Sequence, residues 1–256
     1  MSAVAVSSAL DQALALFEPE NRPAEVRLRD GYLDLLGEGG IDTPHLSHRV
    51  VQSRLLPPLY ERVVHPLSLR IAAGREAPNR HEEQRIGLET MKISSGDRVL
   101  DIGCGPGNFT RSYAAAAGDG LVVGLDSSPV MLASAVRRTP GSNVAYILGD
   151  GCALPFVASS YDAVSCFGAI HLFDRPLEAL REMMRVLAPG GRIGLLTTCE
   201  RGAKGESSDV AKRKYGGWRM FARDELTGAF ESQGMVDVEQ RVMHSVQIVS
   251  ARKPTA

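Results

Sequence analysis

The sequence predicts an α/β fold built around a doubly wound, mostly parallel β-sheet. From about residue 79 onward, short apolar segments alternate with segments whose apolar residues recur at helical spacing. Such alternation is typical of β-α-β units, whose right-handed crossovers place helices on both faces of a parallel sheet. A chain of 256 residues that is 44% hydrophobic can bury the core of one such domain together with an additional segment.

The regular part of the chain predicts five parallel strands, five helices and a closing strand pair. The strands are expected at residues 97–103, 120–126, 143–150, 161–170 and 191–198. The helices are expected at residues 80–91, 109–117, 128–138, 175–188 and 222–234. The last segment, 235–253, is rich in β-branched residues without an intervening helix, so it predicts a hairpin that ends the sheet in an antiparallel strand.

The first 77 residues differ from the rest because prolines break them into short apolar patches. We expect an N-terminal helical cap at residues 1–77, in front of the main domain at residues 78–256. Within the cap, residues 45–74 place apolar side chains near helical spacing. This stripe is expected to close over a ligand or to pack against a neighbour, which includes a second copy of the chain in a homo-oligomer.

A second irregular segment, residues 199–218, combines glycines with the basic run Lys212, Arg213 and Lys214. One interpretation is a lid insertion that suits an acceptor bearing a carboxylate or phosphate. The other interpretation is a solvated charge run, which is the common role of such segments.

The charge balance argues against a polyanionic partner. The chain has 29 Lys and Arg residues against 30 Asp and Glu residues, so no bulk positive field draws it to nucleic acid. We therefore expect a small-molecule partner and no nucleic acid.

The four cysteines lack CxxC spacing and predict free thiols rather than disulfides or a metal site. The first 20 residues lack the early positive charges of a signal peptide, and no run of about 18 apolar residues occurs. These features favour a cytoplasmic protein without stable membrane insertion.

Acidic residues and glycines follow the predicted strands at the edge where open parallel sheets bind ligands. Asp101, Asp126 and Asp150 end three successive strands. After the first strand the sequence is "DIGCGPG", with glycines at alternate positions rather than in the GxGxxG pattern of dinucleotide sites. Because an acid in this loop repels a pyrophosphate and attracts a cation, the pattern predicts a ligand with hydroxyls and a positive group. Alternatively, each Asp is a simple strand-end or N-cap residue.

The chain resembles the class I S-adenosylmethionine-dependent methyltransferases over residues 96–198. The resemblance is carried by five segments in order: residues 99–110, 122–135, 149–156, 161–176 and 180–197. It is similar to the subgroup that contains quinone C-methyltransferases and many small-molecule O-methyltransferases. The resemblance implies a Rossmann-like, seven-stranded sheet and S-adenosylmethionine as cofactor, with S-adenosylhomocysteine as product.

The resemblance also implies roles for individual residues. The glycine loop would lie against the methionine part of the cofactor, and Asp101 would hold its ammonium group. Asp126 would accept both ribose hydroxyls, and Asp150 would bind the adenine amino group. The full implied cofactor set is Asp101, Gly103, Cys104, Gly105, Gly107, Asp126, Ser127, Met131, Asp150, Gly151, Cys152 and Phe167.

His171 follows the fourth strand and is the candidate general base, because an imidazole titrates in the range that deprotonation of a hydroxyl acceptor requires. The alternative is that His171 orients the loop or packs under the substrate. Some relatives place a zinc ribbon before a segment like residues 28–37. Since no cysteine precedes Cys104, we expect no metal and an ordinary packed loop there.

Together these observations predict methyl transfer to oxygen or carbon of a small, ring-containing or prenylated metabolite. One rival is a regulatory protein that binds the cofactor without catalysis. Another is an RNA or protein methyltransferase, which the balanced charge disfavours.

Overall fold

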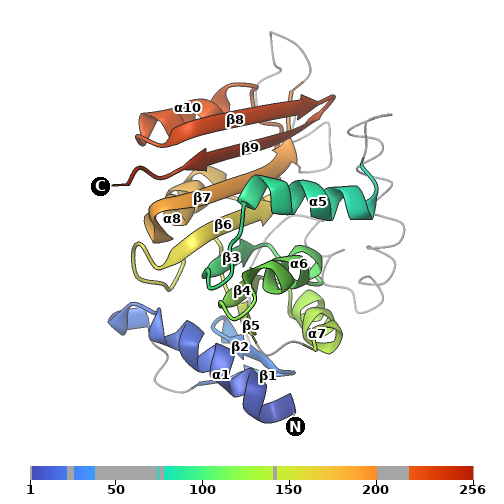
Figure 1. Cartoon of the computed structure of the whole chain (residues 1–256), viewed down its shortest axis with the longest axis vertical. Helices are drawn as coiled ribbons and strands as arrows, with labels where there is room; N and C mark the ends of the chain where they lie inside the picture. The colour runs from blue at the N-terminus through green and yellow to red at the C-terminus, as the bar shows by residue number, and fades with distance from the viewer. Residues whose placement is uncertain are drawn as a thin grey trace.

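One mixed β-sheet forms the centre of the molecule in the computed structural model, which describes residues 2–21, 26–37, 74, 78–140, 143–200 and 219–255. Within these residues the sheet has nine strands in the order β1-β2-β5-β4-β3-β6-β7-β9-β8 (Figure 1). The central strands are β3 (Val99–Ile102), β4 (Val122–Asp126), β5 (Val144–Leu148), β6 (Tyr161–Phe167) and β7 (Leu187–Thr198). They pair in parallel, as the sequence predicts.

The predicted helices of the main domain are confirmed. They are α5 (Arg80–Met91), α6 (Asn108–Ala117), α7 (Pro129–Arg138), α8 (Pro176–Val186) and α10 (Glu225–Ser232). Local sequence explains two of the starts. The Asn79 side chain accepts hydrogen bonds from the first turn of α5 while Glu82 reaches back to the Asn79 N–H, which is a capping box. Ser128 caps α7 directly before a proline at its first position.

The C-terminal hairpin is also confirmed. Strands β8 (Val236–Met243) and β9 (Val246–Arg252) pair antiparallel, and β9 pairs antiparallel with β7. These two strands therefore form an antiparallel edge next to the parallel central strands.

The strand count of seven is wrong, because an N-terminal hairpin adds two strands at the opposite edge. β1 (Leu28–Arg29) and β2 (Tyr32–Asp34) are joined by an Asp30–Gly31 turn in which both residues have positive φ. Such a turn matches the twist of paired strands. β2 pairs in parallel with β5, so residues 28–34 extend the sheet instead of forming the packed loop expected from the sequence.

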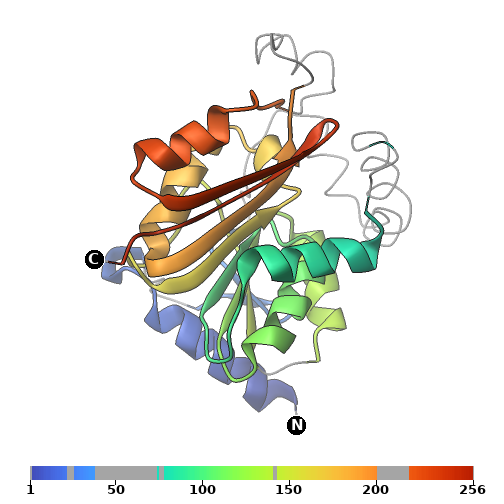
Figure 2. The ribbon, with the colours of Figure 1, turned by 45° about the horizontal axis from the view of Figure 1, so that its top comes forward.

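Helices cover both faces of the sheet (Figure 2). α5, α6 and α7 lie on one face, whereas α8, α10 and α1 (Ser2–Ala15) lie on the other. Each face buries its own apolar cluster against the alternating side chains of the central strands. This arrangement leaves the carboxyl ends of β3 to β6 at one common edge.

Helix α1 is joined to the sheet domain through an aromatic cluster. The ring of Phe156 contacts Phe17 and Tyr161 edge to face, with centroids 5.2 and 5.0 Å apart. Arg185 of α8 donates to the carbonyl oxygens of Leu154 and Phe156 at 3.0 and 2.7 Å. The segment that leads from β5 to β6 is thereby fixed between α1 and α8.

Several expectations concern residues outside the described ones. The apolar stripe at residues 45–74, apart from Gly74, and nearly all of the candidate lid at 199–218 fall there. The domain boundary at residues 77 and 78 stays a prediction. Among the described residues, no helix has the length and apolar character needed to cross a membrane.

The hairpin position can be tested by comparing two leucines. Leu33 on β2 is fully buried, whereas Leu28 on β1 is 61% exposed. We expect Leu33→Ala to lower the free energy of unfolding in urea by about 2–5 kcal/mol, because it opens a cavity in the core. Leu28→Ala should change it by less than about 0.5 kcal/mol. Equal effects of the two substitutions would contradict a structured N-terminal hairpin.

Candidate functional site

A glycine loop follows β3 at the common edge of the sheet. Gly103, Gly105 and Gly107 have φ values of 67°, 53° and 77°, a region that side chains disfavour. A Cβ on Gly103 would lie 2.3 Å from Ala169, and a Cβ on Gly107 would lie 2.4 Å from the Tyr146 hydroxyl. A Cβ on Gly105 would meet nothing within 4 Å. Two glycines are thus required for packing, and Gly105 alone presents backbone to open space.

Asp126, at the end of β4, fixes this loop. Its Oδ2 accepts a hydrogen bond from the Gly105 N–H at 2.8 Å, and its Oδ1 accepts one from the Ser128 N–H at 2.8 Å. The Asp126 side chain and the adjacent Ser127 remain partly exposed. Met131, in the first turn of α7, is buried at 2% exposure. The structure therefore brings Asp126 and Ser127 to the loop surface and turns Met131 inward.

Asp101 lies beneath the loop rather than on its surface. It is 2% exposed, and its two carboxylate oxygens accept hydrogen bonds from Thr110 at 2.6 Å and Ser165 at 2.8 Å. Burial raises the pKa of Asp101 to about 6, against the lowering effect of these two hydroxyls. Burial likewise raises the pKa of the neighbouring Cys104 thiol well above its usual value, so this thiol stays neutral.

The segment after β5 carries the third acid. Asp150 accepts a hydrogen bond from the Cys152 N–H at 2.8 Å and forms an ion pair with Arg175 at 3.5 Å. A Cβ on Gly151 would lie 2.7 Å from the Phe173 ring, so glycine is required there. Burial raises the pKa of the Cys152 thiol to about 11. These contacts order the turn that follows β5.

The segment after β6 supplies an aromatic wall. Phe167 is buried and contacts Phe109 edge to face, with ring centroids 5.0 Å apart. Gly168 follows with a φ of 79° and open space where a Cβ would stand. This turn therefore bends the chain directly beside the glycine loop.

His171 lies beyond that turn, in the short helix η5 (Ile170–Leu172). Its Nδ1 is 3.4 Å from the Thr197 hydroxyl, and its backbone carbonyl oxygen accepts a hydrogen bond from the Arg219 N–H at 3.0 Å. Thr197 belongs to β7. One ring nitrogen thus faces Thr197 of β7, and the residue remains partly exposed.

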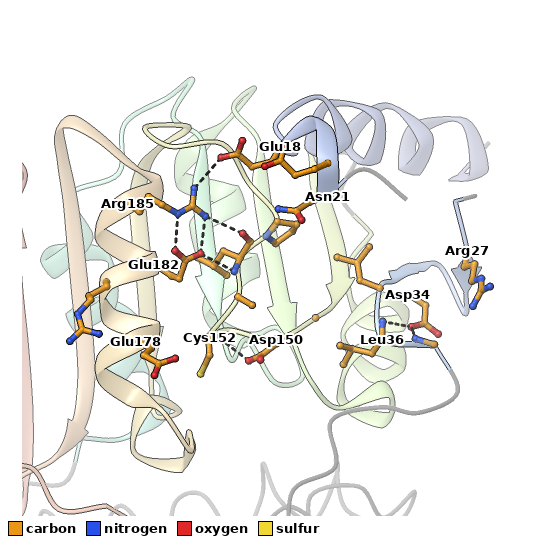
Figure 3. Close-up of a pocket in the computed structure, with 18 residues that line it drawn as sticks. Glu18, Asn21, Arg27, Asp34, Leu36, Asp150, Cys152, Glu178, Glu182 and Arg185 are labelled. Carbon is orange, nitrogen blue, oxygen red and sulfur yellow. Dashed lines mark hydrogen bonds and ion pairs between the residues drawn. The ribbon is translucent and has the colours of Figure 1, made fainter. Parts of the chain in front are cut away.

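A cavity of about 1280 Å³ opens beside β5 (Figure 3). It is lined by the segments after α1, β2 and β5 and by one side of α8, including Asp34, Asp150, Cys152 and Glu182. Arg185 crosses its wall and pairs with Glu182 in Figure 3. The cavity shares Asp150 and Cys152 with the predicted cofactor set but does not reach the glycine loop or His171. We take the strand ends as the site, since the acids and the open glycine converge there.

Three side-chain contacts of the acids at the strand ends were not predicted from the sequence. Thr110 and Ser165 hold Asp101, and Arg175 pairs with Asp150. Ser165 carried a signal, because a polar residue in the middle of an apolar strand requires a buried partner. Arg175 carried none, since an arginine before a proline-led helix is common on surfaces.

Metal chemistry has no candidate ligand set in the part of the chain that the structure describes. No group of three or more His, Cys, Asp or Glu side chains there is arranged to hold an ion. The four cysteines form no disulfide in the structure. At the strand ends, Asp126 and Asp150 are partly exposed, whereas Asp101 lies beneath the glycine loop. Carboxylates in such positions can accept hydrogen bonds from hydroxyls or pair with a cation.

The raised pKa of Asp101 can be tested through stability. A native pKa of about 6, against an ordinary value of 3.8, means that the folded state holds the proton more tightly. The wild type should therefore lose stability relative to Asp101→Asn as pH rises from about 4 to about 6, by about 3 kcal/mol in total. Urea unfolding of both proteins between pH 3.5 and 8 measures this difference. A constant difference in unfolding free energy between the two proteins across that range would contradict a raised pKa of Asp101.

Known proteins share both the sequence pattern and the fold. Residues 99–191 match a family model described as a methyltransferase domain. An uncharacterized chloroplastic methyltransferase of Arabidopsis thaliana is 29% identical over 88% of this chain and 67% of its own length. A demethylmenaquinone methyltransferase of Lactobacillus johnsonii is 30% identical over 59% of this chain and 67% of its own length.

A solved structure extends this comparison. Phosphoethanolamine N-methyltransferase 2 of Haemonchus contortus, in complex with S-adenosylmethionine, superposes with a TM-score of 0.62 at 19% identity, over 78% of this chain and 60% of that one. At this identity the likeness shows the fold alone. The chain spans 67%, 60% and 45% of the length of three of the curated relatives that it matches. By its sequence relatives and its fold, the chain belongs to the class I S-adenosylmethionine-dependent methyltransferases.

Proposed function

We propose that this protein transfers a methyl group from S-adenosylmethionine to oxygen or carbon of a small, ring-containing or prenylated metabolite. The observation that carries the proposal is the open turn at Gly105, pinned by the partly exposed carboxylate of Asp126. An open left-handed glycine admits close approach of a ligand to bare backbone. A carboxylate beside it suits two neighbouring hydroxyls of a ribose.

The residues present fit the cofactor. A side chain at position 105 would fill the space that a methionine moiety needs, and the chain leaves it open. Asp126 would hold the ribose, and Asp150, Gly151 and Cys152 would meet the adenine edge. When bound, the cofactor supplies an electrophilic methyl group on a sulfonium sulfur.

The contribution of the chain to the chemistry is alignment. Methyl transfer from a sulfonium is an in-line displacement, in which positioning of the acceptor supplies much of the acceleration. Phe167 and Phe109 form a water-poor wall at the end of β6. The Gly168 turn leads from that wall to His171 on the acceptor side of the strand ends.

A hydroxyl acceptor must also lose a proton, and His171 is the proposed base. The Nδ1 atom faces the Thr197 hydroxyl, so Nε2 is the nitrogen that would take the proton. This assignment requires Nδ1 to carry the ring hydrogen and donate it to Thr197. A carbon acceptor with an acidic ring hydroxyl would use the same base.

The names of relatives favour a quinone-like acceptor. The Lactobacillus relative is named a demethylmenaquinone methyltransferase, so its named acceptor is a quinone. The net charge of −1 makes an RNA acceptor less suitable. We propose a cytoplasmic enzyme that acts without nucleic acid, and leave a homo-oligomer as a compatible assembly.

A binding experiment followed by a transfer experiment tests the proposal. Calorimetry should detect binding of S-adenosylmethionine and S-adenosylhomocysteine. It should detect little binding of NADH. Incubation with methyl-labelled cofactor and a panel of prenylated quinols, phenols and short RNAs should label a quinol or phenol. Binding without transfer to any acceptor in the panel or in a cell extract would favour a regulatory cofactor-binding protein. Failure to bind either compound at millimolar concentration would reject the proposal.

The ribose role of Asp126 gives a first prediction for this function. Asp126→Asn should weaken S-adenosylhomocysteine binding by about 10- to 100-fold, because charge-assisted hydrogen bonds contribute about 1.5–3 kcal/mol. Calorimetry measures this loss. Asp119→Asn, at an exposed position after α6, serves as the matched control and should bind like the wild type. An unchanged affinity for Asp126→Asn would assign that carboxylate to loop structure only.

The role of His171 gives a second prediction. His171→Gln should lower turnover of a hydroxyl acceptor by about 100-fold or more, since general-base catalysis contributes about 10²- to 10⁴-fold. Cofactor affinity should stay within about twofold, because no predicted cofactor contact is removed. Steady-state kinetics and calorimetry on the same protein give both values. Unchanged turnover would eliminate His171 as the base.

A further inference from the structure

The end of β7 carries a buried hydroxyl at a position where the strand is otherwise apolar. Thr197, the last residue of β7 but one, is 1% exposed. Alternate residues of a strand point to the same face of a sheet, so Thr197 follows Ile193 and Leu195 on one face. Both belong to the apolar cluster on that face, whereas Leu196 belongs to the cluster on the other. A hydroxyl that continues such an apolar row requires a hydrogen-bond partner, because burial of a polar group without one is unfavourable.

The partner of this hydroxyl is the imidazole ring of His171. Thr197 Oγ1 lies 3.4 Å from His171 Nδ1, which is within hydrogen-bonding distance. His171 belongs to η5, the short helix after β6, and η5 packs against β7. The contact therefore connects the end of β7 to the segment that carries the proposed base.

The polar side chain opposite Thr197 is engaged elsewhere. Gln247 of β9 pairs with Thr197 across the two strands and is fully buried. Its Nε2 donates a hydrogen bond to the Thr198 carbonyl oxygen at 2.9 Å, and its Oε1 accepts one from Gln240 Nε2 at 2.7 Å. Both ends of the Gln247 amide are thus bonded to residues other than Thr197, so the hydroxyl of Thr197 is left to face the His171 ring.

The backbone of His171 is held from the same strand end. The Arg219 N–H donates a hydrogen bond to the His171 carbonyl oxygen at 3.0 Å. The Arg219 carbonyl oxygen in turn accepts a hydrogen bond from the Thr198 hydroxyl. Two consecutive residues of β7 therefore hold His171, Thr197 through the ring and Thr198 through the backbone of Arg219. Because β7 lies between β6 and β9 in the sheet, both contacts come from a strand that is paired on each side.

We propose that Thr197 is a positioning residue, whose hydroxyl oxygen accepts the Nδ1–H of His171 and thereby selects the ring tautomer that acts as the base. This proposal rests on the proposed function, in which His171 takes a proton at Nε2. A neutral imidazole carries one ring hydrogen, so the nitrogen opposite the N–H is the one that can accept a proton. Thr197 acts through His171 and touches neither the cofactor nor the acceptor in this assignment.

A hydroxyl at this position is compatible with the whole proton transfer. The proton moves from the acceptor oxygen to Nε2, while Nδ1 keeps its own hydrogen. The ring then carries hydrogens on both nitrogens and needs an acceptor at Nδ1. The Thr197 oxygen supplies that acceptor before and after the step, because a hydroxyl hydrogen rotates to suit its surroundings. The same contact can therefore orient the neutral ring and stabilise the charged one.

Nuclear magnetic resonance of ¹⁵N-labelled protein reads the tautomer without knowledge of the acceptor, because protonated and unprotonated ring nitrogens differ in chemical shift. The measurement is made at about pH 9, where an ordinary imidazole is neutral. The chain has six histidines, and the signals lost in His171→Gln identify those of His171. We expect the wild type to carry the hydrogen on Nδ1. Thr197→Val, which keeps the shape and removes the hydroxyl, should populate the Nε2–H tautomer, and Thr197→Ser should restore the wild-type form.

Kinetics on the same variants test the consequence for turnover. Thr197→Val should lower kcat for a hydroxyl acceptor by about 10- to 100-fold, which is typical when a group that orients a functional histidine is removed. Cofactor affinity and the KM of the acceptor should stay within about twofold, because the defect acts on the chemical step. Thr197→Ser should recover most of the lost turnover. Thr227→Val is the control, because the Thr227 hydroxyl bonds within α10 to the Asp224 carbonyl oxygen, and it should match the wild type in both experiments.

Three results would each overturn the role of Thr197: a wild-type His171 with its hydrogen on Nε2, an unchanged tautomer in Thr197→Val, or a loss of cofactor affinity as large as the loss of kcat. Full turnover of Thr197→Val alongside an inactive His171→Gln would also overturn it. If His171→Gln itself keeps full turnover, or no acceptor is methylated, the proposed function fails instead. The tautomer measurement does not depend on methyl transfer, so the two failures are distinguishable.

Discussion

The carboxylate of Asp126 is the contact on which the rest of the site depends. It accepts a hydrogen bond from the Gly105 N–H, in the loop after β3. It also accepts one from the Ser128 N–H, in the loop after β4 that leads into α7. These hydrogen bonds join the loop after β3 to the loop after β4, so a displacement of one loop relative to the other would break them. Because the carboxylate stays partly exposed, the same group can order the loop and still accept a ligand. Preorganisation of this kind lowers the entropic cost of binding.

The three glycines of the loop are required for different reasons, which only the structure separates. Gly103 leaves room for the Ala169 side chain, and Gly107 leaves room for the Tyr146 hydroxyl. Both glycines therefore allow neighbouring strand ends to pack closely. Gly105 faces open space. The motif is therefore partly a folding requirement and partly a binding surface. A substitution at the first or third glycine would disturb the sheet edge before it affected a ligand.

Much of the main domain could be predicted because the signals for its helices and strands lie within short stretches of sequence. Apolar runs such as 120–126, the Asn79 capping box and the Ser128-Pro129 start each specify an element without long-range information. The N-terminal hairpin could not be placed in this way. Its strands have only two and three residues, and their position depends on pairing with β5, which follows more than 100 residues later. The network that holds Asp101 was missed for the same reason, since Ser165 lies 64 residues away.

Asp101 and Asp126 end neighbouring strands, and their surroundings separate their roles. Asp101 is buried beneath the loop and accepts hydrogen bonds from two hydroxyls, so its cost of burial is partly offset within the protein itself. Asp126 accepts two backbone N–H groups and stays partly exposed. The two hydroxyls and the two N–H groups thus hold both strand ends in place, and of the two carboxylates Asp126 is the one with surface left for a ligand.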